Sequence, residues 1–423
     1  MRNGLLGSIA VLVASAAMAL AQPPGTLPPP TPVEPLPTPA ADPSMAPLLP
    51  GMQQQAEDTV YLERIWFRPE LLVWWVRGQP SRWPLIMTGN QIDGPVPGAP
   101  GAVTIFGGQD IELSTIVGGK ATIGSWLPGS VRVGVEASGF VLERKPVTRN
   151  VFTGPLGIPT IGTPFINDLT GALDFVGASS PGNPGAMSGL AHTQFWGTEC
   201  NMLFNFYRGP RFRWNTILGF RNLNLAETLA VNAFTNVNAG GPTFLGNAAP
   251  IGSTIRWEDR FETNNHYYAG QIGGDFEYRW RFLVFNLTSK TSVGDIHRVV
   301  ESSSFTRLDG AGGPPQVVPG GVLAALTNFG RRTDDTFSWS QEIGLRAAVH
   351  LTRGFMVYYG VDWIWLDNTV RPGDQIDPFV NPTIVPARPE HGALLGGNAV
   401  PNRIFNGSHF WAGGLKFGFN IQY

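Results

Sequence analysis

A set of charged residues falls at the polar positions of segments in which apolar and polar residues alternate. The set is Arg132, Glu136, Glu199, Arg221, Asp275, Glu277, Lys290, Glu342, Arg346, Asp362 and Lys416. If these segments are strands of a closed barrel, the alternation turns the set toward the lumen. Charges of both signs in a narrow lumen either neutralise one another as ion pairs that plug and brace it, or form a ring that selects solutes. The sequence leaves both readings open.

A second group of polar residues offers acid–base chemistry. Asp334 and Asp335 fall where a strand would meet an external loop, and His266 begins another segment, so an acid and a base would converge on a water there. Adjacent Asp residues at a strand end more often cap a loop. The stretch from Arg371 to Asp374 is likewise more often a Pro-Gly turn than a clamp for an anion or Ca²⁺. We therefore expect no enzyme activity.

Motifs for a metal or a cofactor are missing from the chain. The six His show no pairwise spacing suited to a metal, and neither a nucleophile elbow nor a phosphate-binding Gly loop with its Lys is present. Cys200 is the only Cys, so it forms no internal disulfide, and on an apolar stripe it behaves as a small hydrophobe. A net charge of −2 supplies no field for nucleic acid. We expect no cofactor and no nucleic-acid partner.

The elements that would position these residues are strands with a period of two. In Val131 to Leu142, Val133 and Val135 oppose Gly134 and Glu136. The same rhythm predicts about ten strands, near 67–77, 112–127, 130–144, 190–208, 211–227, 264–279, 281–300, 335–351, 354–371 and 406–423. Beyond the N-terminal segment no stretch approaches 18 consecutive apolar residues. Residence in a membrane would therefore require a closed barrel.

The connections between these segments alternate in length. The short turns are Leu127 to Ser130, Tyr207 to Arg211, Tyr278 to Arg281 and Leu351 to Gly354, and the long Gly/Pro-rich stretches are 78–111, 145–189, 228–263, 301–334 and 372–405. Short periplasmic turns and long external loops are typical of outer-membrane barrels. Aromatic residues near segment ends fit interfacial belts; they are Trp74, Trp75, Trp126, Trp196, Trp214, Tyr359, Trp363, Trp365 and Trp411. A secreted β-sandwich is the alternative fold.

The N-terminal region reads as an export signal followed by a spacer. Residues 1–21 combine Arg2, an apolar run and a small-residue cleavage site, as in a cleavable signal peptide. Residues 22–55 are too rich in Pro for a core or a ladder, so we expect a periplasmic linker. Residues 56–423 are then the barrel domain. Only 14% of the chain is charged, which also favours a lipid surround over water.

The C-terminal strand and several motifs carry a family resemblance. The chain ends with an apolar stripe in phase with its last aromatic residue, and Gly418, Ile421 and Tyr423 resemble the signal that barrel assembly machinery reads. The stretches Gly118 to Leu127, Leu218 to Leu229, Asn264 to Trp280 and Arg371 to Pro382 and the closing FWAGGLKFGF run through nearly all of the chain. On these stretches the chain resembles the putative β-barrel porin type-seven family. The resemblance implies a bacterial outer-membrane barrel and supplies no reaction.

The sequence therefore predicts an all-β, closed antiparallel transmembrane barrel of about ten strands (8–12). Its expected role is a porin or passive conduit with a narrow charged lumen for small polar solutes, in contact with outer-membrane lipid. The alternative is a closed structural or adhesive barrel that displays long surface loops and does not conduct. The permeant solute and the oligomeric state are left open.

Overall fold

The computed structural model describes residues 65–130, 132–310, 312–352 and 354–423. The predicted signal peptide, 1–21, and the Pro-rich segment, 22–55, lie outside the described residues. Among the described residues, no helix is both long and apolar enough to cross a membrane.

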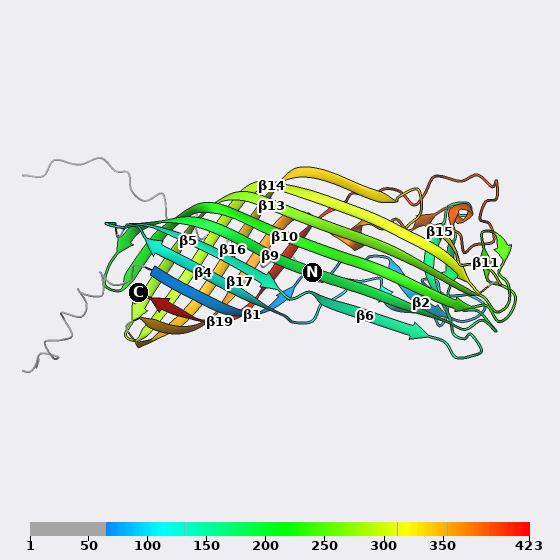
Figure 1. Cartoon of the computed structure of the whole chain (residues 1–423), viewed down its shortest axis with the longest axis horizontal. Helices are drawn as coiled ribbons and strands as arrows, with labels where there is room; N and C mark the ends of the chain where they lie inside the picture. Colours follow the sequence, from blue (N-terminus) through cyan, green and yellow to red (C-terminus); the bar gives the residue numbers. More distant parts are fainter. Residues whose placement is uncertain (1–64, 131, 311, 353) are drawn as a thin grey trace, which may run out of the picture. The chain divides into compact units, whose positions relative to one another are not determined.

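Antiparallel strands pair in a ring of ten (Figure 1). In chain order they are β1 (Ile65–Val76), β4 (Ile116–Trp126), β5 (Val133–Leu142), β9 (Gly185–Arg208), β10 (Phe212–Asn236), β13 (Thr254–Trp280), β14 (Leu283–Asp309), β16 (Gly330–Thr352), β17 (Phe355–Val370) and β19 (Gly407–Gln422). Each pairs with the next, and the last strand pairs with the first, with Leu71 opposite Phe417. Every segment predicted from the two-residue period is a strand of this ring, so the predicted all-β fold of about ten strands is confirmed.

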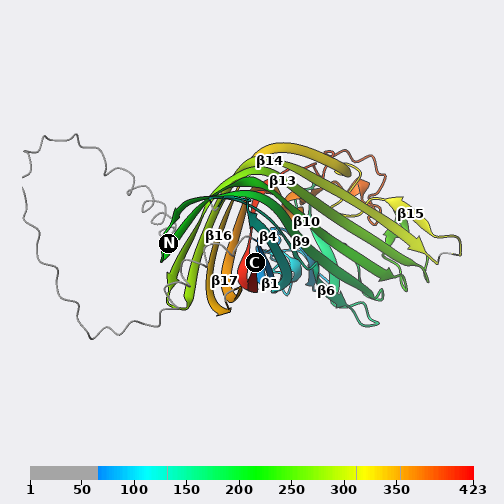
Figure 2. The same ribbon diagram turned by 60° about the vertical axis from the view of Figure 1, so that its left-hand side comes forward.

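The two faces of the ring reverse their polarity along the strands. On β13, Ile272 and Tyr278 are exposed on the outer face, whereas further from the short turns the outer face carries Arg256 and Glu262. The inner face changes from polar to apolar along the same strand. Its buried residues include Glu277 near the short turns and Phe261 and Trp257 further away. Near the short turns the outer face is thus apolar and the inner face polar. In the part of the strands further from the short turns, which we call the distal part, the outer face is polar and the inner face apolar, as in a domain surrounded by water. Figure 2 shows that the distal parts of β9, β10, β13 and β14 continue side by side.

Two of the five predicted long loops are in large part strand. β10 runs on to Asn236 and β13 begins at Thr254, and β14 and β16 likewise extend through much of 301–334. The predicted strands are shorter than the observed ones because they were defined by apolar residues on the outer face. That pattern stops where the polarity of the two faces reverses. β6 (Lys145–Phe152) and β15 (Gln316–Pro319) add to the ring at β9 and β14.

The remaining long connections form a second sheet that packs against the distal inner face of the ring. Its strands are β2 (Pro84–Gly89), β3 (Val103–Gly107), β7 (Thr160–Asn167), β8 (Leu173–Gly177) and β18 (Phe379–Val380). We call it the inner sheet. Its Ile86, Ile161 and Phe165 share one buried cluster with Leu229 of β10 and Phe261 of β13. The predicted loops are therefore folded structure with a core of their own.

Candidate functional site

The charged residues on the inner face near the short turns surround a cavity of about 110 Å³, and we call them the interior cluster. Seven are basic (Arg68, Lys120, Arg213, Arg221, Lys290, Arg346 and Lys416) and seven are acidic (Glu70, Glu136, Glu199, Asp275, Glu277, Glu342 and Asp362). The formal charge of the cluster is therefore +7 − 7 = 0. A water needs about 10–15 Å³ by this measure, so the cavity has room for several waters only.

Arg221 lies at the centre of the interior cluster. Its guanidinium Nη2 donates to Glu199 Oε2 at 2.6 Å and also contacts the carboxylate of Glu342. Lys290 Nζ bridges the same two carboxylates, at 2.7 Å from Glu199 and 3.2 Å from Glu342. Because these four side chains come from β9, β10, β14 and β16, the ion pairs tie together strands that lie apart in the ring.

Further ion pairs surround this centre. Lys416 Nζ lies 2.6 Å from Asp362 Oδ1, and Tyr358 donates its hydroxyl to Glu70 at 3.0 Å. Other pairs in the same cavity join Arg68 to Glu136 and Arg213 to Glu277. Most charges of the interior cluster therefore face a charge of opposite sign, and the ion pairs join side chains from different strands of the ring.

All but one of the charged residues singled out from the sequence meet in the interior cluster. Arg132 is the exception, since it is exposed in the turn before β5. Because Arg132 lies in a turn and not in the strand, the alternation of inward and outward side chains does not fix the direction of its side chain. Trp74 and Trp126, expected in an interfacial belt, are instead buried at 1% and 7% exposure. For Trp74 the neighbouring Trp75, 45% exposed, occupies the outer position.

Sequence reasoning missed Arg68, Glu70, Lys120, Arg213 and Tyr358. The alternation of side chains along the strand could have indicated Lys120. It lies three residues before the exposed Ile123 and therefore on the opposite, inner face of β4. Arg213 lies inside the predicted segment 211–227 and alternates in phase with Asn215 and Arg221, so the same pattern places it on the inner face. Tyr358 was counted as neither charge nor outer-face residue, although its hydroxyl reaches Glu70.

An apolar layer fills the interior directly beyond the interior cluster. Its centre is a row of aromatic rings, in which Trp74 lies 5.6 Å from Phe140, Phe140 lies 5.2 Å from Phe195, and Phe195 lies 4.9 Å from Phe410 between ring centroids. The buried members of this layer are Leu72, Trp74, Val76, Leu113, Ile116, Leu142, Phe195, Leu223, Leu225, Tyr267, Ala269, Ile296, Ile364, Leu366, Phe410 and Ala412. Close-packed aromatic and aliphatic side chains exclude water at this level.

A buried ion pair closes the apolar layer on its distal side. Arg371, at the start of the chain segment that leaves β17, donates from Nε and Nη2 to the two oxygens of Glu227 at 2.7 and 2.6 Å. Both side chains are fully buried. Arg371 also donates to the carbonyl of Gly78 at 2.9 Å and stacks over the ring of Phe410. Two of the stretches that carry the family resemblance, Leu218 to Leu229 and Arg371 to Pro382, are thus joined by one side-chain pair.

Replacing Arg371 with Ala is expected to lower the free energy of unfolding by about 3–5 kcal/mol, because the buried Glu227 would lose its counter-charge and keep only the hydroxyl of Thr193, at 2.7 Å, as a side-chain donor. It should also release the segment after β17, so amide hydrogen exchange should rise in residues 372–406. The double variant Arg371→Met with Glu227→Gln removes both charges at similar volume and should recover most of the loss. Equal exchange in the wild type and in Arg371→Ala would contradict this assignment.

Asp259 anchors a loop on the distal inner face. Its carboxylate accepts backbone N–H groups from Val322 at 3.0 Å, Leu323 at 2.9 Å and Ala324 at 3.2 Å. Burial raises the pKa of Asp259 to about 7, against the lowering effect of these hydrogen bonds. This contact holds residues 321–325 against the ring.

The residues considered in the sequence for acid–base chemistry, Asp334, Asp335 and His266, do not converge as that chemistry would need. Asp334 pairs with Arg298, and Asp335 Oδ1 lies 2.6 Å from Nδ1 of His297. Nδ1 of His266 instead lies 2.7 Å from the side-chain amide of Asn224, and the His266 ring lies beside His297 on the outer face, with 6.3 Å between the two ring centroids. The sequence could not indicate His297, because strand pairing alone brings it between His266 and Asp335.

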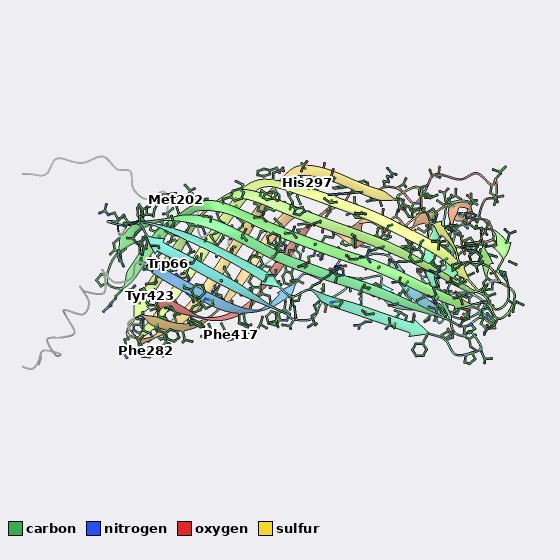
Figure 3. The ribbon with its side chains drawn as sticks, in the orientation of Figure 1. Trp66, Met202, Phe282, His297, Phe417 and Tyr423 are labelled. Carbon is green, nitrogen blue, oxygen red and sulfur yellow. The ribbon has the colours of Figure 1, made fainter. Side chains whose placement is uncertain are left out.

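The residues of the predicted assembly signal lie along the final strand. Gly418 faces inward beside Tyr358, where an added Cβ would meet the phenol oxygen at 2.8 Å. Tyr423 is exposed at the end of the strand, where Figure 3 also places Trp66, Met202 and Phe282. Phe417 and Phe419, on either side of Gly418, are exposed on the outer face, and Ile421 is half-buried two residues further along.

Comparisons with known proteins give one family and several distant structures. The model of the family described as putative beta barrel porin-7 matches residues 66–423. No curated protein sequence matches the chain. Among solved structures, the outer membrane protease OmpT from Escherichia coli is 10% identical with a TM-score of 0.38, over 86% of this chain and 98% of that one. The toluene transporter TodX from P. putida is 6% identical with a TM-score of 0.23, over 87% and 92% of the two chains.

Proposed function

Because the chain belongs to the putative beta barrel porin-7 family, we propose that it is a closed β-barrel of the bacterial outer membrane. We further propose that its interior is sealed and that it serves as a rigid, non-conducting anchor for its external half. The observation that carries the seal is the apolar layer around Phe195 and Phe410, which lies between the neutral interior cluster and the inner sheet.

The exposed apolar side chains on the outer face near the short turns, which we call the exposed apolar band, support the placement in a membrane. β1, β4 and β5 have 12, 11 and 10 residues, and a tilted transmembrane strand needs about 9–11. On the longer strands most exposed apolar side chains, such as Ile272, Val293 and Ile343, lie in the part near the short turns, and Phe305 of β14 is a distal exception. The charged outer face of the distal part would then stand in water, on the external side of the membrane.

The remaining expectations follow from this placement and stay proposals. Residues 1–21 would direct export and be cleaved, and residues 22–55 would form a periplasmic tail. Lipid would cover the exposed apolar band, and the assembly machinery would read the last strand through Gly418, Ile421 and Tyr423. We propose no enzymatic reaction.

A narrow conduit is the second candidate, and the family description together with the polar cavity favours it. Passage along the axis would require the rings of Trp74, Phe195 and Phe410 to move apart and the inner sheet to shift. The zero formal charge of the interior cluster also gives no preference for either sign of ion. We therefore favour the sealed barrel.

Planar-bilayer recording of the refolded protein distinguishes the two candidates. The sealed barrel predicts no stepwise conductance in concentrated KCl at any applied voltage. Insertion is verified separately by the shift in apparent mass between unboiled and boiled samples, and an open porin inserted under the same conditions is the positive control. Reproducible single-channel steps from inserted protein would overturn the sealed barrel and support the conduit.

A further inference from the structure

Two histidines from neighbouring strands lie side by side on the outer face of the ring. His266 on β13 is directly opposite His297 on β14, and their ring centroids are 6.3 Å apart. The same row continues to Asn224 on β10 and to Asp335 on β16. His297 is 37% exposed, and Figure 3 places it well away from the short turns. This pair lies where the outer face changes from apolar to polar, just beyond the exposed Tyr268.

The residues at the two ends of the row, Asn224 and Asp335, each contact the Nδ1 atom of the neighbouring histidine ring. Nδ1 of His297 lies 2.6 Å from Asp335 Oδ1, and Nδ1 of His266 lies 2.7 Å from the amide of Asn224. Since Asn224 and Asp335 flank the pair on opposite sides, the Nδ1 atoms point away from each other. The opposite edge of each ring, which carries Nε2, therefore faces the space between the two histidines.

We propose that His266 and His297 bind one divalent transition-metal ion, such as Zn²⁺, Ni²⁺ or Cu²⁺, through their Nε2 atoms. Metal–nitrogen bonds of about 2.1 Å place two imidazoles on one ion with centroids on the order of 6 Å apart, close to the observed 6.3 Å. Imidazole is a suitable ligand for these three metals. Positions left open on the ion take water or an external ligand.

Asp335 acts in this site as a positioning residue. A carboxylate that accepts the Nδ1 proton fixes the tautomer in which Nε2 is the metal-binding atom, and it makes that nitrogen more basic. Asn224 now donates to Asn264 Oδ1 at 3.1 Å. It serves His266 in the same way when both amides turn by about 180°, so that the Asn224 oxygen accepts the Nδ1 proton and the Asn264 nitrogen faces Asn224. The inference does not depend on whether the interior conducts, because the row lies on the outer face.

Zn²⁺ titration of tag-free, detergent-folded protein at pH 7.5, followed by calorimetry, tests the site. We expect one saturable site per chain that binds Zn²⁺ at least tenfold more weakly in His266→Ala and in His297→Ala and is unchanged in His391→Ala. Asp335→Asn should bind about tenfold more weakly. The unboiled gel shift shows that each variant is folded.

Electron paramagnetic resonance with Cu²⁺ supplies an independent measurement. We expect the spectrum of bound Cu²⁺ to show coupling to two imidazole nitrogens, reduced to one in either single variant. The proposal is overturned if wild-type protein shows no saturable binding up to millimolar Zn²⁺, or if His266→Ala binds as tightly as the wild type.

Discussion

Arg221→Ala is expected to lower the free energy of unfolding by about 3–5 kcal/mol, since it removes one partner from a buried ion-pair network. Glu199 and Glu342 would face each other across the space that Arg221 leaves, with Lys290 as their nearest remaining bridge. Urea titration of protein folded in lipid vesicles, followed by Trp fluorescence, measures the loss.

Arg132→Ala is the matched control for this experiment. Arg132 comes from the same sequence-derived set of charged residues, but it is exposed in a turn. Its replacement should change the unfolding free energy by less than about 0.5 kcal/mol. A loss in Arg221→Ala no larger than in Arg132→Ala would mean that the interior ion pairs do not brace the ring.

Phe195→Ala is expected to cost about 3–5 kcal/mol, because it opens a void in the apolar layer and removes contacts to Phe140 and Phe410. The comparison is Phe417→Ala on the outer face, where Phe417 is 45% exposed. Lipid fills the space left by Phe417, so only the transfer term of about 1.5–3 kcal/mol is lost. The same urea titration measures both variants, and a loss in Phe417→Ala that equals or exceeds the loss in Phe195→Ala would contradict the assignment of inner and outer faces.

The sequence predicted the ring well because its strands near the turns obey one simple rule. Wherever an apolar residue such as Ile343 faces outward, its neighbour Glu342 must face inward, and this alternation identified both the strands and most of the interior cluster. The rule failed at Arg132, because a turn residue is free of the alternation. It also failed at Trp74, since tryptophan suits a packed interior as well as a membrane interface.

The distal half of the molecule could not be predicted in the same way. Once the polarity reverses, the outward residues of β13 are charged, and Gly and Pro interrupt the chain between short strands that pair only through tertiary contacts. The pair of Glu227 and Arg371 connects residues 144 positions apart, and no local pattern marks either one as a partner. The two histidines are hidden for the same reason, because their separation along the chain has meaning only in the register of β13 and β14.

The pairing of β1 with β19 has a consequence for the order in which the molecule is made. Among the strands that the structure describes, β1 comes first in the chain, and one of its edges is covered only by the sixteen residues of β19, Gly407–Gln422. Until β19 is in place, the backbone donors and acceptors along that edge need a substitute partner or protection from aggregation. A chain truncated before Gly407 would keep most of its sheet, but the ring would stay open between β17 and β1 because β19 pairs with both. Quality control that recognises an unpaired β1 would therefore detect such a truncated chain.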